Sequence, residues 1–334
     1  MKAVRYLGKE MIGLEEIGRP SIGEDEVLIK IVYCGICGSD MSIYFGKHPR
    51  AKAPLVLGHE FSGEIAELPA GYRGTFSVGD NVTVNPLLSC HKCTPCITGN
   101  SHVCKTLGLT GIDADGGFAE FVKVHIDQLV KLPSDMSVEL GAIVEPVAVA
   151  VHAVRRSALK VGDVVLIIGG GPIGFLISLV ARAAGARKII VIEPSDFRRQ
   201  LLSNLGFETM AEAIQGKIFS LTESDGADIV FEVAGVAEAM DAAVKYCKIR
   251  GQIVNVSVFK QPTPVDLMRV NFAELDIVGT RVYAKEDFVT AVDLIAKIPE
   301  IAGVITHKLP LARAQEGIDL MKQGSYNQKV LLFP

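Results

Sequence analysis

The sequence has no long uninterrupted apolar run, no strong charge of either sign and no low-complexity tract. Hydrophobic residues make up 49% of its 334 residues. No stretch of about 18 of them, however, avoids charge, glycine and proline as a membrane span would require. A net charge of −4 gives no footprint for a polyanion such as nucleic acid, and no repeat occurs at solenoid spacing. These absences exclude membrane-spanning and repeat proteins and argue against nucleic-acid binding. The length suggests a soluble protein of two domains.

A secretory signal is also missing, because Met1–Arg5 leads directly into a short strand-like run. We therefore expect a cytoplasmic protein, in a reducing compartment that disfavours disulfides.

Four cysteines form a C-x2-C-x2-C-x7-C run at Cys90, Cys93, Cys96 and Cys104. Short turns between cysteines let thiolates converge on one tetrahedral Zn²⁺ with no open position for chemistry. The alternatives are two disulfides, four unrelated buried thiols or a zinc ribbon that binds nucleic acid. The surrounding segment is poor in basic residues, and we predict a structural zinc site.

Residues 1–135 contain short strand-like runs separated by turns that contain glycine, proline or aspartate. This spacing is typical of a β-rich, barrel-like domain. The expected strands cover residues 27–32, 60–68, 81–85 and 118–124.

A different rhythm follows Pro133. One or two helices are expected within Ser137–Arg156, interrupted at Glu145-Pro146, and strands then alternate with helices. Such alternation predicts a parallel sheet with crossover helices. The expected strands are 163–168, 188–193, 229–232, 252–256, 275–278 and 329–333, and the expected helices are 172–184, 196–205, 285–298 and 311–323.

The turn after the first of these strands carries G-x-G-x-x-G at Gly169, Gly171 and Gly174, with Pro172 and Ile173 between the last two. This motif is specific only where it follows a buried strand and opens a helix, as it does here. Gly169 allows the tight turn, Gly171 lets a pyrophosphate approach the helix N-terminus, and Gly174 allows close contact between helix and strand. We predict a dinucleotide site.

Glu193 ends the next strand, 24 residues after Gly169. A carboxylate there accepts hydrogen bonds from the ribose hydroxyls and repels a 2′-phosphate, which favours NAD over NADP. Arg198 and Arg199 leave the alternative open, because an arginine in this place can stack on adenine or bind a 2′-phosphate.

Several further motifs occur in an order that resembles the zinc-dependent medium-chain dehydrogenase/reductase family, over nearly the whole chain. Within that family the chain is similar to the polyol and secondary-alcohol branch, which includes sorbitol, butanediol and threonine dehydrogenases. The motifs are Gly35–Asp40, Gly58–Glu60, the four-cysteine run, Asp115–Glu120, Glu145-Pro146 and the glycine-rich turn.

The resemblance implies a GroES-like catalytic domain at 1–146 and 285–334 and a doubly wound Rossmann domain at 147–284. It implies two zinc ions per chain, with Cys37 and His59 as ligands of the catalytic one. The third protein ligand is Glu60 or Glu145. Because adjacent strand residues point to opposite faces, His59 and Glu60 can both bind only if the backbone turns between them.

The resemblance also assigns Ser39 as the hydroxyl that takes the alcohol proton, against the alternative of a turn hydroxyl bonded to backbone. Many relatives carry a histidine five residues after the zinc cysteine, where this chain has Ser42. A water path or His48 could take its place, although His48 is also interpretable as an exposed loop residue.

We therefore predict an NAD-dependent zinc dehydrogenase of a secondary alcohol in a polyol, sugar derivative or vicinal diol, forming a homodimer or homotetramer. Glutamate as the third protein ligand makes a harder site than a second cysteine, and such a site suits more oxygen ligands. One alternative is a sugar-acid 5-dehydrogenase, with the basic loop Lys47–Lys52 or Arg281 attracting the acid, although either could instead be a solvated loop or an interdomain ion pair. Another is a non-catalytic dinucleotide sensor of the same fold.

Overall fold

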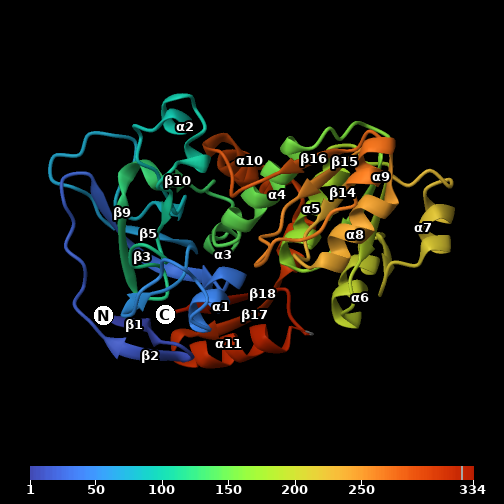
Figure 1. Ribbon diagram of the computed structural model, residues 1–334. Coiled ribbons are helices and arrows are strands. Elements are labelled where there is room, and N and C mark those ends of the chain that lie inside the picture. Colours follow the sequence, from blue (N-terminus) through green and yellow to red (C-terminus); the bar gives the residue numbers. More distant parts are fainter. Residues whose placement is uncertain (325) are drawn as a thin grey trace. The chain divides into compact units, whose positions relative to one another are not determined.

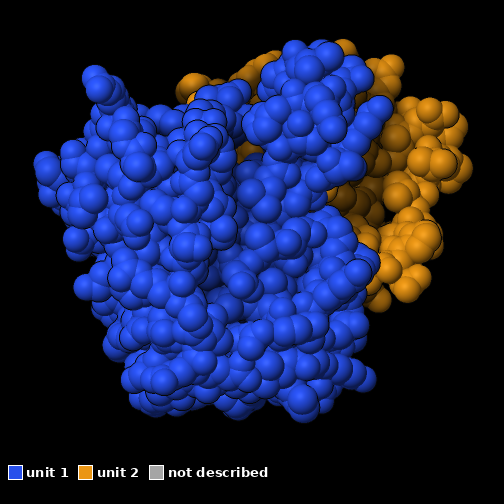
Figure 2. Space-filling view, turned by 90° about the vertical axis from the view of Figure 1, so that its left-hand side faces the viewer, with its two compact units in different colours: residues 1–145, 284–297, 305–334 blue, residues 146–283, 298–304 orange. Residues whose placement is uncertain are grey.

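The computed structural model describes residues 1–324 and 326–334 (Figure 1). They form two compact units (Figure 2). Unit 1 comprises Met1–Glu145, Ala284–Lys297 and Ile305–Pro334, and unit 2 comprises Pro146–Tyr283 and Ile298–Val304.

Ile298–Val304 belongs to unit 2, whereas the domain limits expected from the sequence placed this segment in the first domain. It forms the 3₁₀ helix η3 (Pro299–Val304), in which Ile301 and Val304 are fully buried. Within unit 2, Glu300 forms an ion pair with Arg182 at 2.9 Å. Burial of these apolar side chains and this ion pair account for its place in unit 2.

Unit 1 is rich in β-strands. One sheet has the order β2-β1-β4, a second has the order β10-β6-β5-β3-β18-β17 with β9 also paired to β3, and a third pairs β7 with β8. The strands are β1 (Lys2–Gly8), β2 (Met11–Glu16), β3 (Glu26–Gly35), β4 (Leu55–Val56), β5 (Glu60–Glu67), β6 (Asn81–Val84), β7 (Leu87–Leu88), β8 (Gly108–Leu109), β9 (Phe121–His125), β10 (Leu129–Lys131), β17 (Ile305–Pro310) and β18 (Lys329–Phe333).

The helices of unit 1 are short apart from two near the end of the chain. They are α1 (Gly38–Tyr44), α2 (Thr94–Ile97), α3 (Val138–Gly141), α10 (Lys285–Lys297) and α11 (Ala314–Gln323), with 3₁₀ helices η1 (Ser101–Val103), η2 (Ile126–Gln128) and η4 (Leu311–Arg313). The stretch that carries α2 protrudes from the sheets (Figure 1).

Three strands distant in sequence meet at one point of the second sheet. Gly35 at the end of β3 pairs with Glu60 at the start of β5 and with Leu331 of β18. This register places the beginning of β5 and the last strand of the chain on either side of the end of β3. Residues of all three strands lie in one buried core.

Unit 2 contains a parallel sheet of order β13-β12-β11-β14-β15-β16, three of whose strands are labelled side by side in Figure 1. Strand order reverses between β11 and β14, which makes their carboxyl ends the topological switch point where ligands bind in such sheets. The strands are β11 (Val164–Ile168), β12 (Lys188–Ile192), β13 (Glu208–Met210), β14 (Ala227–Glu232), β15 (Cys247–Asn255) and β16 (Asp276–Gly279).

The helices of this unit follow the strands as crossovers, and the predicted fold class is confirmed. They are α5 (Pro172–Ala183), α6 (Asp196–Asn204), α7 (Gln215–Leu221), α8 (Ala237–Tyr246) and α9 (Leu267–Phe272). The helix α4 (Val144–Arg156) begins at the boundary between the two units. Among the described residues, no helix is both long and apolar enough to cross a membrane.

The predicted break at Glu145-Pro146 is wrong. These residues lie in the first turn of α4, and the break between α3 and α4 falls at Ala142-Ile143. Proline is tolerated in a first turn because the backbone N–H it lacks has no intrahelical partner there. Proline at this position therefore belongs to the start of a helix and does not interrupt one.

Candidate functional site

Three candidate ligands converge in unit 1. Cys37 is the residue before α1, His59 precedes β5, and Glu60 is its first residue. One possible ligand atom from each lies within 4.8 Å of the other two. We call these residues the mixed cluster.

Gly58 resolves the question of how adjacent residues can share a site. Its φ of +92° is in the left-handed region, so the chain turns immediately before His59 and becomes a regular strand only from Glu60. A Cβ at this position would lie 2.5 Å from the Phe118 ring and 2.6 Å from the Cys34 sulfur. Glycine is therefore required here both by conformation and by space.

Asp40, which the sequence analysis did not single out, supports the backbone beside the ligands of the mixed cluster. Its fully buried carboxylate accepts a hydrogen bond from Cys37 N at 2.8 Å and one from Gly58 N at 3.4 Å. Its Oδ1 lies 3.8 Å from His59 Nδ1. Burial raises the pKa of Asp40, and the neighbouring His59 opposes that shift. The carboxylate faces Nδ1 of the imidazole, whereas Nε2 is the ring nitrogen near Ser39. The sequence signal that could have identified Asp40 is an acidic residue three positions after the candidate ligand Cys37, in the first turn of α1.

Ser39 lies beside the mixed cluster. Its Oγ is 3.3 Å from His59 Nε2. Burial alone would lower the pKa of His59, but the charges of Cys37, Asp40 and Glu145 raise it well above its usual range. The site is thus a strongly negative, buried environment of the kind that attracts a cation.

Lys329 is a second residue that the sequence did not reveal. Its Nζ lies 2.7 Å from both carboxylate oxygens of Glu60 and donates to Ile36 O at 3.3 Å. Both side chains of the pair are at most 3% exposed. Burial would lower the pKa of Lys329, but Glu60 and Cys37 raise it. The pairing of β18 with β3 brings the lysine to the cluster. These strands are far apart in the sequence, so no local pattern predicts the contact.

Glu145 is buried in the first turn of α4. It does not belong to the mixed cluster at the 4.8 Å limit. Its charge nevertheless contributes to the raised pKa values of His59 and Lys329. It is therefore near the cluster, and the geometry favours Glu60 over Glu145 as third ligand.

The mixed cluster fits a zinc ion. Thiolate, imidazole and carboxylate are all zinc ligands. Their candidate ligand atoms lie within 4.8 Å of one another, and His59 and Glu60 are buried. A thiol, an imidazole and a carboxylate gathered in this way are explained if the side chains are arranged around a cation.

The four cysteines also converge, and we call them the four-cysteine cluster. Cys93 Sγ lies 3.5 Å from Cys96 Sγ and 3.8 Å from Cys104 Sγ, and Cys90 Sγ lies 4.0 Å from Cys96 Sγ. All seven cysteines are free thiols, so no disulfide competes. Backbone N–H groups of Lys92 and Cys93 lower the pKa of Cys90 to about 6. Desolvation instead raises the pKa of Cys96 to about 12. Four thiols gathered at this spacing fit a closed tetrahedral zinc site.

The glycine-rich turn of unit 2 has the geometry of a phosphate-binding turn. Gly169 has φ +108°, and a Cβ at Gly174 would run directly into Gly169 O. Gly171 precedes α5, whose first residues are Pro172 and Ile173. Backbone N–H groups at the start of α5 are therefore free to face an anion.

Glu193 lies against this turn. Its Oε2 accepts from Gly170 N at 2.8 Å and its Oε1 accepts from Ser195 N at 2.9 Å. Arg198 Nη1 lies 4.0 Å from Glu193 Oε2, and desolvation lowers the pKa of Arg198. Arg199 instead bonds the Glu193 and Pro194 carbonyls and Asp196. Of the two arginines, Arg198 is therefore the one beside the turn.

The basic loop Lys47–Lys52 offers less unpaired positive charge than the sequence suggests. Arg50 forms a two-pronged ion pair with Asp113, at 3.0 and 2.9 Å, so its charge is matched within unit 1. His48 Nδ1 accepts from Ala51 N at 3.2 Å, and desolvation lowers the pKa of His48. Lys52 and Arg281 are both exposed.

The comparisons with known proteins agree with this geometry. Residues 23–134 match the alcohol dehydrogenase GroES-like domain and residues 172–297 match the zinc-binding dehydrogenase domain. The 2-dehydro-3-deoxy-L-galactonate 5-dehydrogenase of Pseudoalteromonas atlantica is 39% identical over 300 residues, which is 89% of this chain and 87% of that protein.

Solved structures that cover this whole chain include the two that follow. The 2R,3R-butanediol dehydrogenase of Bacillus subtilis has a TM-score of 0.92 at 32% identity, over 100% of this chain and 99% of that one. A zinc-binding dehydrogenase of Sinorhizobium meliloti bound to NADP has a TM-score of 0.89 at 31% identity, with the same coverage.

Proposed function

Because the chain belongs to the zinc-dependent medium-chain dehydrogenase family, in its polyol branch, we propose that it oxidises a secondary alcohol of a polyol, sugar derivative or vicinal diol. The carbinol carbon gives a hydride to NAD, the hydroxyl gives up a proton, and a ketone and NADH result. The observation that carries the proposal is the convergence of Cys37, His59 and Glu60 to within 4.8 Å.

In this proposal the mixed cluster holds the catalytic zinc and the four-cysteine cluster holds a structural one, both within the catalytic domain. When bound, the catalytic zinc acidifies an alcohol hydroxyl so that its proton leaves near neutral pH. Asp40 orients His59, and Lys329 balances the charge of Glu60. These contacts keep the ligand side chains in one arrangement.

Ser39 is our candidate for the first proton acceptor. Its hydroxyl lies within 3.3 Å of a ring nitrogen of the cluster, so it stands where a hydroxyl of the substrate must arrive. Replacing Ser39 by Ala should lower kcat about 10²-fold or more, the usual contribution of a positioned acid–base group. Ser39→Thr, which keeps the hydroxyl, is the matched control.

We propose that the Rossmann domain binds NAD in preference to NADP. Glu193 is buried against the glycine-rich turn, where its charge disfavours a 2′-phosphate. Arg198 beside it and the NADP-bound relative argue for the alternative. Measuring kcat/KM for both cofactors decides it, and Glu193→Ala should shift the ratio towards NADP.

A sugar acid is the second candidate substrate class. The relative from Pseudoalteromonas atlantica, named for such a substrate, favours it. Arg50 is a weak partner for the acid because Asp113 already neutralises it, which leaves the exposed Lys52 as the better candidate. Lys52→Ala should raise KM for acids and leave neutral polyols unaffected, with the exposed Lys260→Ala as control.

The test is NADH formation over a panel of polyols, vicinal diols and hexonates, with each cofactor. We expect turnover with at least one member and none after zinc removal. A dinucleotide sensor would instead bind NADH and turn over nothing, which would refute the enzymatic proposal.

We further propose a cytoplasmic homodimer or homotetramer. All seven cysteines are free, as a reducing compartment maintains them. β16 ends its sheet, and the neighbouring α9 exposes Leu267, Met268 and Phe272 at 70%, 68% and 84%. Light scattering should give a dimer or a tetramer, and Phe272→Glu should weaken it.

A further inference from the structure

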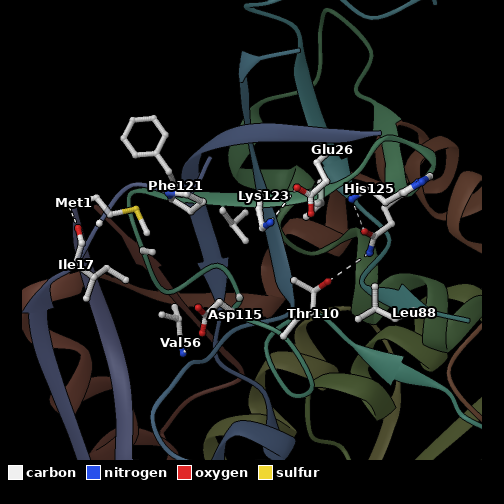
Figure 3. A pocket seen from close by; sticks show the side chains of 18 residues that line it. Met1, Ile17, Glu26, Val56, Leu88, Thr110, Asp115, Phe121, Lys123 and His125 are labelled. Atoms are coloured by element: carbon white, nitrogen blue, oxygen red, sulfur yellow. Dashed lines mark hydrogen bonds and ion pairs between the residues drawn. The ribbon is translucent and has the colours of Figure 1, made fainter. Parts of the chain in front are cut away.

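Glu232, the last residue of β14, is fully buried and has only neutral hydrogen-bond partners among the described residues. The charged groups that line a cavity of unit 1 are arranged differently. There Lys123 and the Met1 α-ammonium accompany the carboxylates of Glu26 and Asp115, and Lys123 pairs with Glu26 at 2.9 Å (Figure 3). Taking a carboxylate out of water without a cation is costly, which makes Glu232 a candidate functional group.

The carboxylate of Glu232 joins two segments that follow neighbouring strands. Its Oε1 accepts from Ala234 N at 2.9 Å and from Gly235 N at 2.7 Å, in the turn between β14 and α8. Its Oε2 accepts from the hydroxyl of Ser257, two residues after the end of β15. The backbone carbonyl of Glu232 also accepts from Val256 N at 2.9 Å and from Ser257 N at 3.2 Å. Glu232 thus fixes the turn after β14 to the segment after β15.

Both segments lie at the topological switch point of the sheet. Val233 N donates to Ile168 O at 2.9 Å, and a Cβ at Gly169 would lie 3.1 Å from Ala234 N. The turn after β14 is therefore in direct contact with the glycine-rich turn. Glu193 follows β12, on the other side of β11. A dinucleotide binds across such a point. With its adenosine ribose at Glu193, its nicotinamide half therefore meets the ends of β14 and β15.

The carboxylate also fixes the direction of the Ser257 hydroxyl. A carboxylate only accepts hydrogen bonds, so the hydroxyl donates its proton to Glu232 and its lone pairs remain to accept another. Asn255, the register neighbour of Glu232 on β15, offers a second acceptor. Its Oδ1 is buried and forms no hydrogen bond within the described residues. This edge of the sheet therefore suits a ligand group that donates hydrogen bonds, such as a ribose hydroxyl or a carboxamide N–H.

We propose that Glu232 is a positioning residue for the nicotinamide half of the cofactor. It holds the turn between β14 and α8 in place, and it presents Ser257 Oγ as an acceptor to the second ribose or to the carboxamide. This inference rests on the proposed function, and it adds to the dinucleotide site a contact that the glycine-rich turn and Glu193 do not supply.

Titration calorimetry with NADH, ADP-ribose and ADP tests the assignment. Glu232→Ala should weaken NADH binding about tenfold or more, because hydrogen bonds to a charged group contribute more than neutral ones. ADP lacks the nicotinamide half and should keep its affinity. A loss shared by NADH and ADP-ribose assigns the contact to the second ribose, and a loss confined to NADH assigns it to the nicotinamide carboxamide. An ADP affinity that falls as much as that of NADH would refute the assignment.

Glu232→Gln separates positioning from simple closure of the turn. Its amide oxygen can still accept from Ala234 N and Gly235 N, but its amide nitrogen cannot accept the Ser257 proton. We expect a stability close to that of the wild type in urea unfolding, together with NADH binding that is about fivefold weaker, the scale of one lost hydrogen bond. A Glu232→Gln protein that binds NADH as the wild type does would overturn the proposal.

Ser257→Ala provides the same test if Glu232→Ala does not fold. It leaves both backbone hydrogen bonds of Glu232 in place and removes only the hydroxyl. We expect the same loss of NADH affinity, about fivefold, and unchanged binding of ADP. Unchanged NADH binding in Ser257→Ala would show that the hydroxyl does not meet the cofactor, which also contradicts the proposal.

Asp228→Asn is the matched control, on the same strand but at its amino end. Asp228 accepts from Val164 N at 2.9 Å and pairs with Lys248 at 3.0 Å. Its replacement should lower stability and leave all three affinities unchanged, and an NADH loss equal to that of Glu232→Gln would refute a specific role of Glu232. A wild type that binds none of the three ligands would refute the proposed dinucleotide site, and this inference with it. Wild-type binding with unaltered Glu232 variants would refute this inference alone.

Discussion

The two clusters of unit 1 bring their ligands together by different means. The four-cysteine cluster draws all its ligands from Cys90 to Cys104, a single protruding stretch with two short helices. The mixed cluster draws on the turn before α1 and on the start of β5, and depends on β18 for Lys329. A closed local site can be identified from spacing, whereas a site assembled by a sheet requires the fold first.

Removal of a ligand from the mixed cluster should have the largest effect on activity. Cys37→Ala should lower turnover about 10³-fold or more, because the several kcal/mol that the metal contributes to the transition state are lost. Circular dichroism should be unchanged. Cys247→Ala removes a buried thiol of unit 2, whose pKa burial raises to about 12, and should keep full activity. Equal losses in both variants would contradict the assignment.

Removal of a ligand from the four-cysteine cluster should chiefly affect stability. Cys93→Ser should cost several kcal/mol of unfolding free energy, since the binding energy of a structural metal is folding energy. The variant should lose one zinc and keep turnover per folded molecule. Ile97→Ala, on the same stretch with 70% exposure, is the control. Loss of turnover in a fully folded Cys93→Ser protein would break the distinction between the clusters.

Lys329→Met should destabilise the metal-free protein by about 3–5 kcal/mol, because it leaves the Glu60 carboxylate buried without its cation. Urea unfolding in the presence of a chelator measures this. Adding Glu60→Gln should restore part of the loss, which a packing defect at position 329 would not allow. A fully stable single variant would show that the pair does not hold the site.

Asp40→Asn should weaken zinc binding at the mixed cluster about 10–100-fold, the usual loss when the carboxylate behind a ligating histidine is removed. Competition with a chromophoric chelator measures it. The four-cysteine cluster should retain its affinity in the same sample and provides the internal control. A loss shared by both sites would indicate general unfolding.

Acid should release zinc from the four-cysteine cluster. The pKa of Cys90 is lowered to about 6 by backbone N–H groups, so its thiolate is present above that pH and becomes protonated below it. Zinc competes with that proton, and affinity should fall by about tenfold per pH unit below pH 6 for this ligand alone. Affinity that rises on acidification would contradict the assigned state.

Much of the fold and of the candidate site was predictable from the sequence because the signals are local. The strand Lys329–Phe333 has the expected bounds, and the glycine-rich turn was identified from its strand and helix. The family and the chemistry of alcohol oxidation were confirmed by the comparisons. The helix break at Glu145-Pro146 was misplaced because proline has a second, favourable position in helices.

Asp40 and Lys329 were not predicted, for a physical reason. A buried charge is identified by the group that neutralises it, and here the partners lie 19 and 269 residues away, at His59 and Glu60. The pairing of Arg50 was likewise not predicted, since its partner Asp113 lies 63 residues further along the chain. A charged residue with no partner nearby in the sequence can be neutralised by a distant residue in the folded protein.

The most direct test of the account is the zinc content per chain of the wild type, Cys37→Ala and Cys93→Ser, measured together with turnover. The account predicts two zinc ions in the wild type and one in each variant, with turnover lost only in Cys37→Ala. One zinc in the wild type, or a Cys37→Ala protein that retains both zinc ions and its turnover, would contradict it.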